Sequence, residues 1–171
     1  MRTSIDATHL PPLGGQVREQ VTLCLQQTLV ELVDLGLVGK QLHWTVVGEL
    51  FRPLHAQLDD LVDSWRDLAD TVAERLVAIG GVPDAQASTV TSGSGWEPID
   101  ARPVEAQEAV RVVARRLAEA AERARDRVNR LGTLDLASQD VAIQVLRVLE
   151  KQLWMVRVQF AEPMDGHRAQ A

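Results

Sequence analysis

The sequence has few of the residues on which several common classes of protein depend. Its 171 residues include a single cysteine, Cys24, so the chain can form neither an intrachain disulfide framework nor a metal centre built on several thiolates. Its only lysines are Lys40 and Lys151, and the formal net charge is -6. Because contacts with phosphates require clustered basic residues, this balance disfavours nucleic-acid binding over the whole surface.

Long uninterrupted apolar runs are absent as well. The first fifteen residues lack the apolar stretch of a signal peptide, and no other segment approaches the roughly 20 apolar residues of a membrane span. We therefore expect a cytoplasmic protein without a membrane partner. A hydrophobic content of 46% is sufficient for one domain with a sizeable core.

The seven prolines lie outside or at the edges of long segments rich in Leu, Val, Ala, Glu and Arg, which predicts helices over about 16–47, 51–79, 103–131 and 136–160. No strand is predicted. The third helix carries many Arg and Glu residues, which we expect on a solvated, salt-bridged face.

The second and third helices are separated by a connection over 84–102, rich in Ser, Thr, Gly and Pro, that has room for a short helix. A long crossover of this kind is needed when those two helices run in the same direction. The prediction is an all-α four-helix bundle at 16–160, with tails at 1–15 and 161–171.

The segment 43–74 holds two half-sets of metal ligands that one helix cannot bring together. His55 and Asp59 are four residues apart, as are Asp70 and Glu74, and at about 100° per residue all four side chains share an arc about 100° wide. His55 and Asp70 are nonetheless fifteen residues apart, which is about 22 Å along a helix. One chain therefore cannot close the site.

These four positions are symmetric about a point between residues 64 and 65. If a second copy of the helix packs antiparallel across a twofold axis there, His55 and Asp59 face the partner's Asp70 and the partner's Glu74. The spacing predicts a dimer with two equivalent sites. Their imidazole and carboxylate ligands suit Fe2+, Mn2+ or Zn2+.

His43 becomes a third ligand candidate on the same chain if a break at Gly48 folds the end of the first helix against the start of the second. Taken singly, none of these residues identifies a metal site. Acidic residues on helices are usually solvated, and a histidine beside a tryptophan is more often packed than ligating. The prediction depends on the joint spacing.

The ligand candidates belong to a longer motif. It comprises His43-Trp44, Val46, Gly48, Phe51, Leu54-His55 and Asp59, followed by Asp70, Ala73-Glu74-Arg75 and a Gly-Gly-x-Pro ending. This motif resembles the Dps family, the DNA-binding proteins from starved cells that form miniature ferritin cages. A looser similarity extends over the whole chain, as far as Lys151 and Leu153-Trp154.

The resemblance implies a ferritin-like bundle, assembled as a hollow dodecamer with ferroxidase centres at twofold interfaces. It assigns His43, His55 and Asp59 of one subunit, together with the partner's Asp70 and the partner's Glu74, as iron ligands. The implied activity is oxidation of Fe2+, preferably by hydrogen peroxide and otherwise by oxygen. Ferric mineral would be stored in the cage, which protects the cell against oxidative stress.

Four further residues gain candidate roles from the resemblance. Trp44 is a candidate either to intercept oxidising equivalents or to pack at the dimer interface, and Lys40 is either a partner of a site carboxylate or an ordinary surface lysine. Asp135 and Asp140 lie near the start of the fourth helix. They are candidates for an acidic pore or for capping that helix.

Two alternatives stay open: a DNA-binding nucleoid protein whose metal site is vestigial or filled by zinc, and a helical oligomer without a metal role. The tails do not favour DNA binding, because Arg2 is set against Asp6, and Arg168 against Glu162 and Asp165. A di-iron site inside one bundle, as in classical ferritins, is excluded because no Glu is followed three residues later by His.

Overall fold

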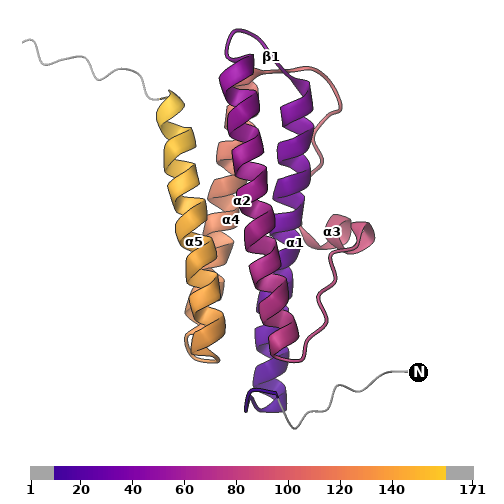
Figure 1. Cartoon of the computed structure of the whole chain (residues 1–171), viewed down its shortest axis with the longest axis vertical. Coiled ribbons are helices and arrows are strands. Elements are labelled where there is room, and N and C mark those ends of the chain that lie inside the picture. Colours follow the sequence, from indigo (N-terminus) through magenta and orange to yellow (C-terminus); the bar gives the residue numbers. More distant parts are fainter. Residues whose placement is uncertain (1–9, 161–171) are drawn as a thin grey trace, which may run out of the picture.

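The computed structural model describes residues 10–160 of the chain. Four long helices form the bundle: α1 (Gly15–Thr45), α2 (Phe51–Ala78), α4 (Ala106–Leu131) and α5 (Leu136–Arg157). A short helix, α3 (Ala87–Gly93), lies in the crossover beside α1, and the 3-10 turn η2 (Val158–Phe160) follows α5 (Figure 1). The all-α four-helix bundle with a long crossover between its second and third long helices is confirmed.

A two-residue parallel ladder corrects the prediction that the chain has no strand. The strand β1 (Val46–Val47) pairs with β2 (Val104–Glu105), so α1 ends at Thr45 and α4 begins at Ala106. Gly48 follows β1 with a φ of 102°, a left-handed conformation that favours glycine. This turn reverses the chain between α1 and α2.

The core joins all four long helices, and Trp65 of α2 is among its largest fully buried side chains. Nε1 of Trp65 donates to Oε1 of Gln152 in α5 at 2.8 Å. On the side of α1, a Cβ built on Gly39 would lie 2.7 Å from Cζ3 of Trp65 and 2.6 Å from Cγ2 of Val62. Only glycine therefore lets α1 and α2 approach this closely, and the approach sets how near His43 of α1 lies to His55 and Asp59 of α2.

The charged residues of α4 do not all lie on a solvated face. Arg116 and Arg127 are buried, with 4% and 6% of their surfaces exposed. Arg127 donates two hydrogen bonds, of 2.6 and 2.7 Å, to the carboxylate of Glu31 in α1. Arg116 donates to the carbonyl oxygen of Glu97 and lies over the ring of Trp96. For these two arginines the expectation of a solvated face was wrong, because they attach α4 to α1 and to the crossover.

Helix α1 also corrects the expectation about apolar segments. Within residues 10–160 it is the one helix that is long and apolar enough to cross a membrane, judged by length and composition. Of its most apolar window, 56% is buried against the rest of the chain. That burial is typical of a core helix in a bundle, and the apolar residues of α1 supply much of the core.

The two predicted tails fall almost entirely outside the described residues. Of the first tail, 10–15 are described: 10–14 precede α1 without regular structure, and Gly15 already begins α1. The tail residues that bear on DNA binding are not placed: Arg2, Asp6, Glu162, Asp165 and Arg168.

Candidate metal centre

Two histidines and a carboxylate converge where the end of α1 meets the start of α2. His43 lies in the last turn of α1, and His55 and Asp59 lie one turn apart near the start of α2. One ligand atom from each of the three side chains lies within 4.8 Å of the other two. The turn at Gly48 thus brings together the three candidates that belong to one chain.

Reciprocal hydrogen bonds hold the two imidazole rings. Nδ1 of His43 lies 2.9 Å from the carbonyl oxygen of His55, and Nδ1 of His55 lies 2.9 Å from the carbonyl oxygen of His43. Because a carbonyl oxygen only accepts, each Nδ1 is the donor in its bond, and Nε2 is the ring nitrogen left for a ligand. Metal-binding histidines are usually held in this way.

Ring packing restrains the same two histidines further. Their centroids are 3.6 Å apart with an interplanar angle of 23°, and the ring of Phe51 lies 5.1 Å from that of His55. His43 is buried, whereas His55 is half-buried. The histidine pair is therefore fixed by main-chain bonds and by stacking before any ion binds.

Asp59 lies between the histidine pair and Lys40. Nζ of Lys40 is 2.6 Å from Oδ1 of Asp59, and Nδ1 of His43 is 3.4 Å from the same oxygen. The hydrogen bond from Lys40 lowers the pKa of Asp59 below its ordinary value, and the nearby histidines act in the same direction against the effect of burial. Asp59 is consequently a charged carboxylate at neutral pH, as a metal ligand must be. Lys40 contacts this carboxylate and is not a free surface lysine.

An apolar groove of about 260 Å³ runs between α1 and α2 beside this cluster. Leu37 and Trp44 line it and are 58% and 69% exposed, and Lys40 lies 6.0 Å from the centre of the Trp44 ring. Large apolar side chains with this exposure are typical of a surface that another protein covers.

Asp70 and Glu74 lie apart from the cluster. Both are exposed on α2, and neither side chain forms a hydrogen bond or an ion pair within the described part of the chain. The structure of one chain therefore assembles one of the two half-sets of ligands and leaves the other bare, as the fifteen-residue spacing requires.

Comparison with known proteins agrees with this arrangement. Residues 23–162 match the family model described as "Ferritin-like domain". The chain is 31% identical over 148 residues to a "DNA protection during starvation protein" of Mycolicibacterium smegmatis, which covers 86% of this chain and 81% of that protein. The chain belongs to the Dps family.

Further Dps relatives extend the match. A solved structure of Mycobacterium smegmatis Dps has a TM-score of 0.88 and 28% identity, and covers 99% of this chain and 98% of that one. The "DNA protection during starvation protein 2" of Deinococcus radiodurans is 30% identical over 151 residues, which make up 88% of this chain. The chain spans only 63% of that relative's length.

In this Dps chain, Asp135 caps α5. Its Oδ2 accepts from the backbone N–H of Ser138 at 2.9 Å and lies 2.6 Å from Nη2 of Arg75. Burial raises the pKa of Asp135, but the hydrogen bonds from Ser138 and Arg75 outweigh it and lower the pKa below its ordinary value. Asp140 is exposed, without a partner among residues 10–160. The capping role proposed for Asp135 is thus seen directly.

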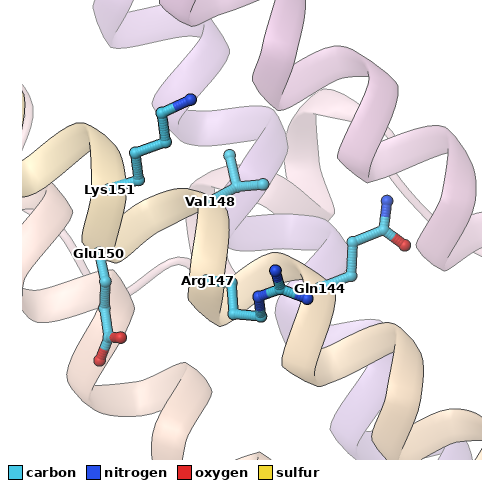
Figure 2. A pocket seen from close by; sticks show the side chains of 5 residues that line it. All are labelled: Gln144, Arg147, Val148, Glu150 and Lys151. Atoms are coloured by element: carbon cyan, nitrogen blue, oxygen red, sulfur yellow. The ribbon is translucent and has the colours of Figure 1, made fainter.

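A separate hollow of about 630 Å³ lies on the surface of α5, and none of the residues of the metal-ligand cluster lines it. Figure 2 shows Lys151, Val148 and Gln144 projecting to one side of α5, whereas Glu150 projects to the other. Glu150 is paired there with Arg125 of α4. The hollow contains no set of ligands and is not the candidate site.

Sequence reasoning gave no role to two features of the metal centre. The reciprocal main-chain bonds of His43 and His55 depend on tertiary contact, and no local pattern signals them. The second feature is the ion pair of Arg75 with Asp135. Its one sequence signal was that Arg75 belongs to the motif and directly follows Glu74.

Proposed function

We propose that this chain is an iron-storing ferroxidase, a miniferritin whose iron sites are shared between subunits. The observation that carries the proposal is the cluster of His43, His55 and Asp59, with both imidazoles held by Nδ1 and one carboxylate kept charged. Imidazole and carboxylate ligands suit Fe2+ and tolerate its oxidation. Fe2+ is here the substrate.

The partner's Asp70 and the partner's Glu74 complete each site in this proposal. Three observations support it: these carboxylates have no bond within residues 10–160, their spacing mirrors that of His55 and Asp59, and an exposed apolar groove with Trp44 lies beside the cluster. A twofold dimer covers the groove and brings the two half-sets together. Six such dimers would make the hollow dodecamer.

The chemistry follows from the ligands. Two Fe2+ ions give one electron each to hydrogen peroxide, the O–O bond breaks, and two protons complete two molecules of water. Oxygen is the alternative oxidant. Carboxylates from both subunits stabilise the growing positive charge on iron, and the histidines hold the ions at a fixed place.

The ferric product is stored as mineral inside the cage, in the cytoplasm and without a membrane partner. The relatives are named for DNA protection, and removal of Fe2+ and peroxide protects DNA without contact with it. Trp44 packs at the twofold interface in this proposal and, as the neighbour of His43 in the chain, is a candidate to intercept a stray oxidising equivalent. Asp140 and Asp135 lie beside the acidic pore through which Fe2+ enters.

Complementation between subunits tests the shared site. Stopped-flow absorbance follows the apoprotein after mixing with Fe2+ and hydrogen peroxide, and we expect a fast phase that either Asp59→Ala or Glu74→Ala abolishes. When the two inactive chains are co-assembled, each mixed dimer regains one intact site, so the fast phase returns in part. Asp63→Ala is the matched control, because Asp63 is an exposed carboxylate of α2 paired only with Arg66 among the described residues.

The possible results separate the candidate functions. Wild-type protein without a fast phase would contradict the ferroxidase and would favour the nucleoid protein with a zinc-filled site. Activity in the wild type with no recovery in the mixture would contradict the intersubunit arrangement. Light scattering after size exclusion measures the assembly in each case, and a wild-type monomer would refute the shared site.

A further inference from the structure

At the end of α2 that carries Asp70 and Glu74, Arg75 adds polar contacts with α5 to the apolar packing of that helix. This residue follows Glu74 directly, and its side chain is only 18% exposed. Nη2 of Arg75 lies 2.6 Å from Oδ2 of Asp135, and Nε donates to Oγ of Ser138 at 2.9 Å. The side chain of Asp135 is 14% exposed, and Ser138 is fully buried.

These bonds join the last turns of α2 to the first turn of α5. Asp135 is the N-cap of α5, so one carboxylate oxygen accepts both from Arg75 and from the α5 main chain. The guanidinium group is planar, and its two bonds to different acceptors restrain the rotation of α2 as well as its position along the helix axis. Further up, α2 and α5 are linked through Trp65, Gln152 and Ser64.

We infer that Arg75 is a positioning residue for the ligands Asp70 and Glu74, and that it acts through Asp135 and Ser138. The inference rests on the proposed function. Asp70 and Glu74 form no bond of their own within residues 10–160, so the direction of their carboxylates is set by the helix that carries them. Because metal ligands must be held within a fraction of an ångström, a loosened end of α2 weakens the ion's binding at the partner's histidines.

Binding of Co2+, followed by its visible absorption, tests this in the assembled apoprotein together with Fe2+ kinetics. Arg75→Gln should raise the Co2+ dissociation constant and the KM for Fe2+ about tenfold, with kcat nearly unchanged. Arg75→Lys keeps the charge but not the two-directional bonding, and should recover part of the affinity.

Two further variants remove one contact each. Asp135→Asn keeps a good helix cap but removes the ion pair, and Ser138→Ala removes the acceptor of the second bond. Both should weaken Co2+ binding in the same direction as Arg75→Gln. The matched control is Arg125→Gln, which removes an exposed ion pair between α4 and α5 and should leave Co2+ binding unchanged.

Wild-type affinity in Arg75→Gln would overturn the inference while leaving the proposed ferroxidase intact. If Arg75→Gln fails to assemble, Asp135→Asn and Ser138→Ala decide in its place, and wild-type Co2+ binding in both would overturn it. An equal loss of affinity in Arg125→Gln would show a general effect of destabilisation and would also overturn it. Wild-type protein that neither binds Co2+ nor oxidises Fe2+ would refute the proposed function and this inference together.

Discussion

The ligand candidates at the two ends of α2 differ in how far the fold of one chain fixes their side chains. At the first end, His55 and Asp59 are fixed by main-chain bonds, ring stacking and Lys40 within one chain. At the other end, Asp70 and Glu74 are exposed carboxylates without a partner among the described residues. The fold of one chain therefore builds one half of the proposed site, and only assembly can bring the other half to it.

The difference has a physical reason. Imidazole rings can stack and be partly buried at less electrostatic cost than carboxylates, which repel one another when they are held together without a cation. Exposed Asp70 and Glu74 stay hydrated until an ion is present. We expect the ion to stabilise the subunit interface for the same reason, because it binds the assembled state alone.

We expect the largest disturbance of the half-site formed by His43, His55 and Asp59 from a methyl group added at Gly39. A Cβ there would lie within 2.7 Å of Trp65 and Val62, so Gly39→Ala forces α1 away from α2. We expect a loss of about 1–3 kcal/mol in the free energy of unfolding. Because His43 lies one turn further along α1, the Co2+ affinity should also fall.

Chemical denaturation and Co2+ titration measure the two effects of Gly39→Ala. Gly15→Ala is the control on the same helix, since a Cβ at Gly15 meets nothing within 4 Å. Unchanged Co2+ affinity in Gly39→Ala would show that the close approach of α1 and α2 does not set the geometry of the histidine pair.

A smaller change at Lys40 sharpens the comparison. Lys40 places a positive charge 2.6 Å from the Asp59 carboxylate and so competes with an incoming cation. Lys40→Met removes this competition, and we expect the Co2+ dissociation constant to fall about fivefold. Lys40→Arg keeps the charge and should leave the affinity near that of the wild type. Weaker binding in Lys40→Met would instead show that Lys40 orients Asp59 for the ion.

Sequence patterns were sufficient for the parts of the molecule that depend on periodicity and breaks. The prolines and glycines delimit the long helices, the turn at Gly48 brings His43 to His55, and the spacing of the four α2 candidates separates them into two half-sets. All of these are properties of residues near one another in the chain, or of a single helix.

Contacts between distant segments were beyond such patterns. The ladder of β1 with β2 joins segments that lie on either side of α2 and the crossover. In the sequence of either helix alone, Arg127 and Glu31 look like exposed charged residues. Only the packing of α4 on α1 buries the pair. A charged residue is buried when its partner arrives from another helix, and one sequence does not show which partner that is.

The smallest expected effect concerns the ion pair of Asp135 with Arg75, which holds the end of α2 that carries Asp70 and Glu74. Because the pKa of Asp135 is lowered in the folded chain, its contribution to stability is complete above the unfolded pKa of about 4 and is lost as the pH falls through the folded value. Asp135→Asn should therefore lower the free energy of unfolding by about 1 kcal/mol at neutral pH.

The gap between the two proteins should begin to narrow below about pH 4 and should close once the pH falls below the lowered folded pKa of Asp135, where the wild-type carboxyl group is neutral as well. Denaturant titrations at several pH values measure it, and Asp140→Asn is the control at an exposed position of the same helix. A gap that persists at low pH would mean that Asp135 acts on α5 as a neutral cap. The ion pair with Arg75 would then contribute nothing to holding the end of α2.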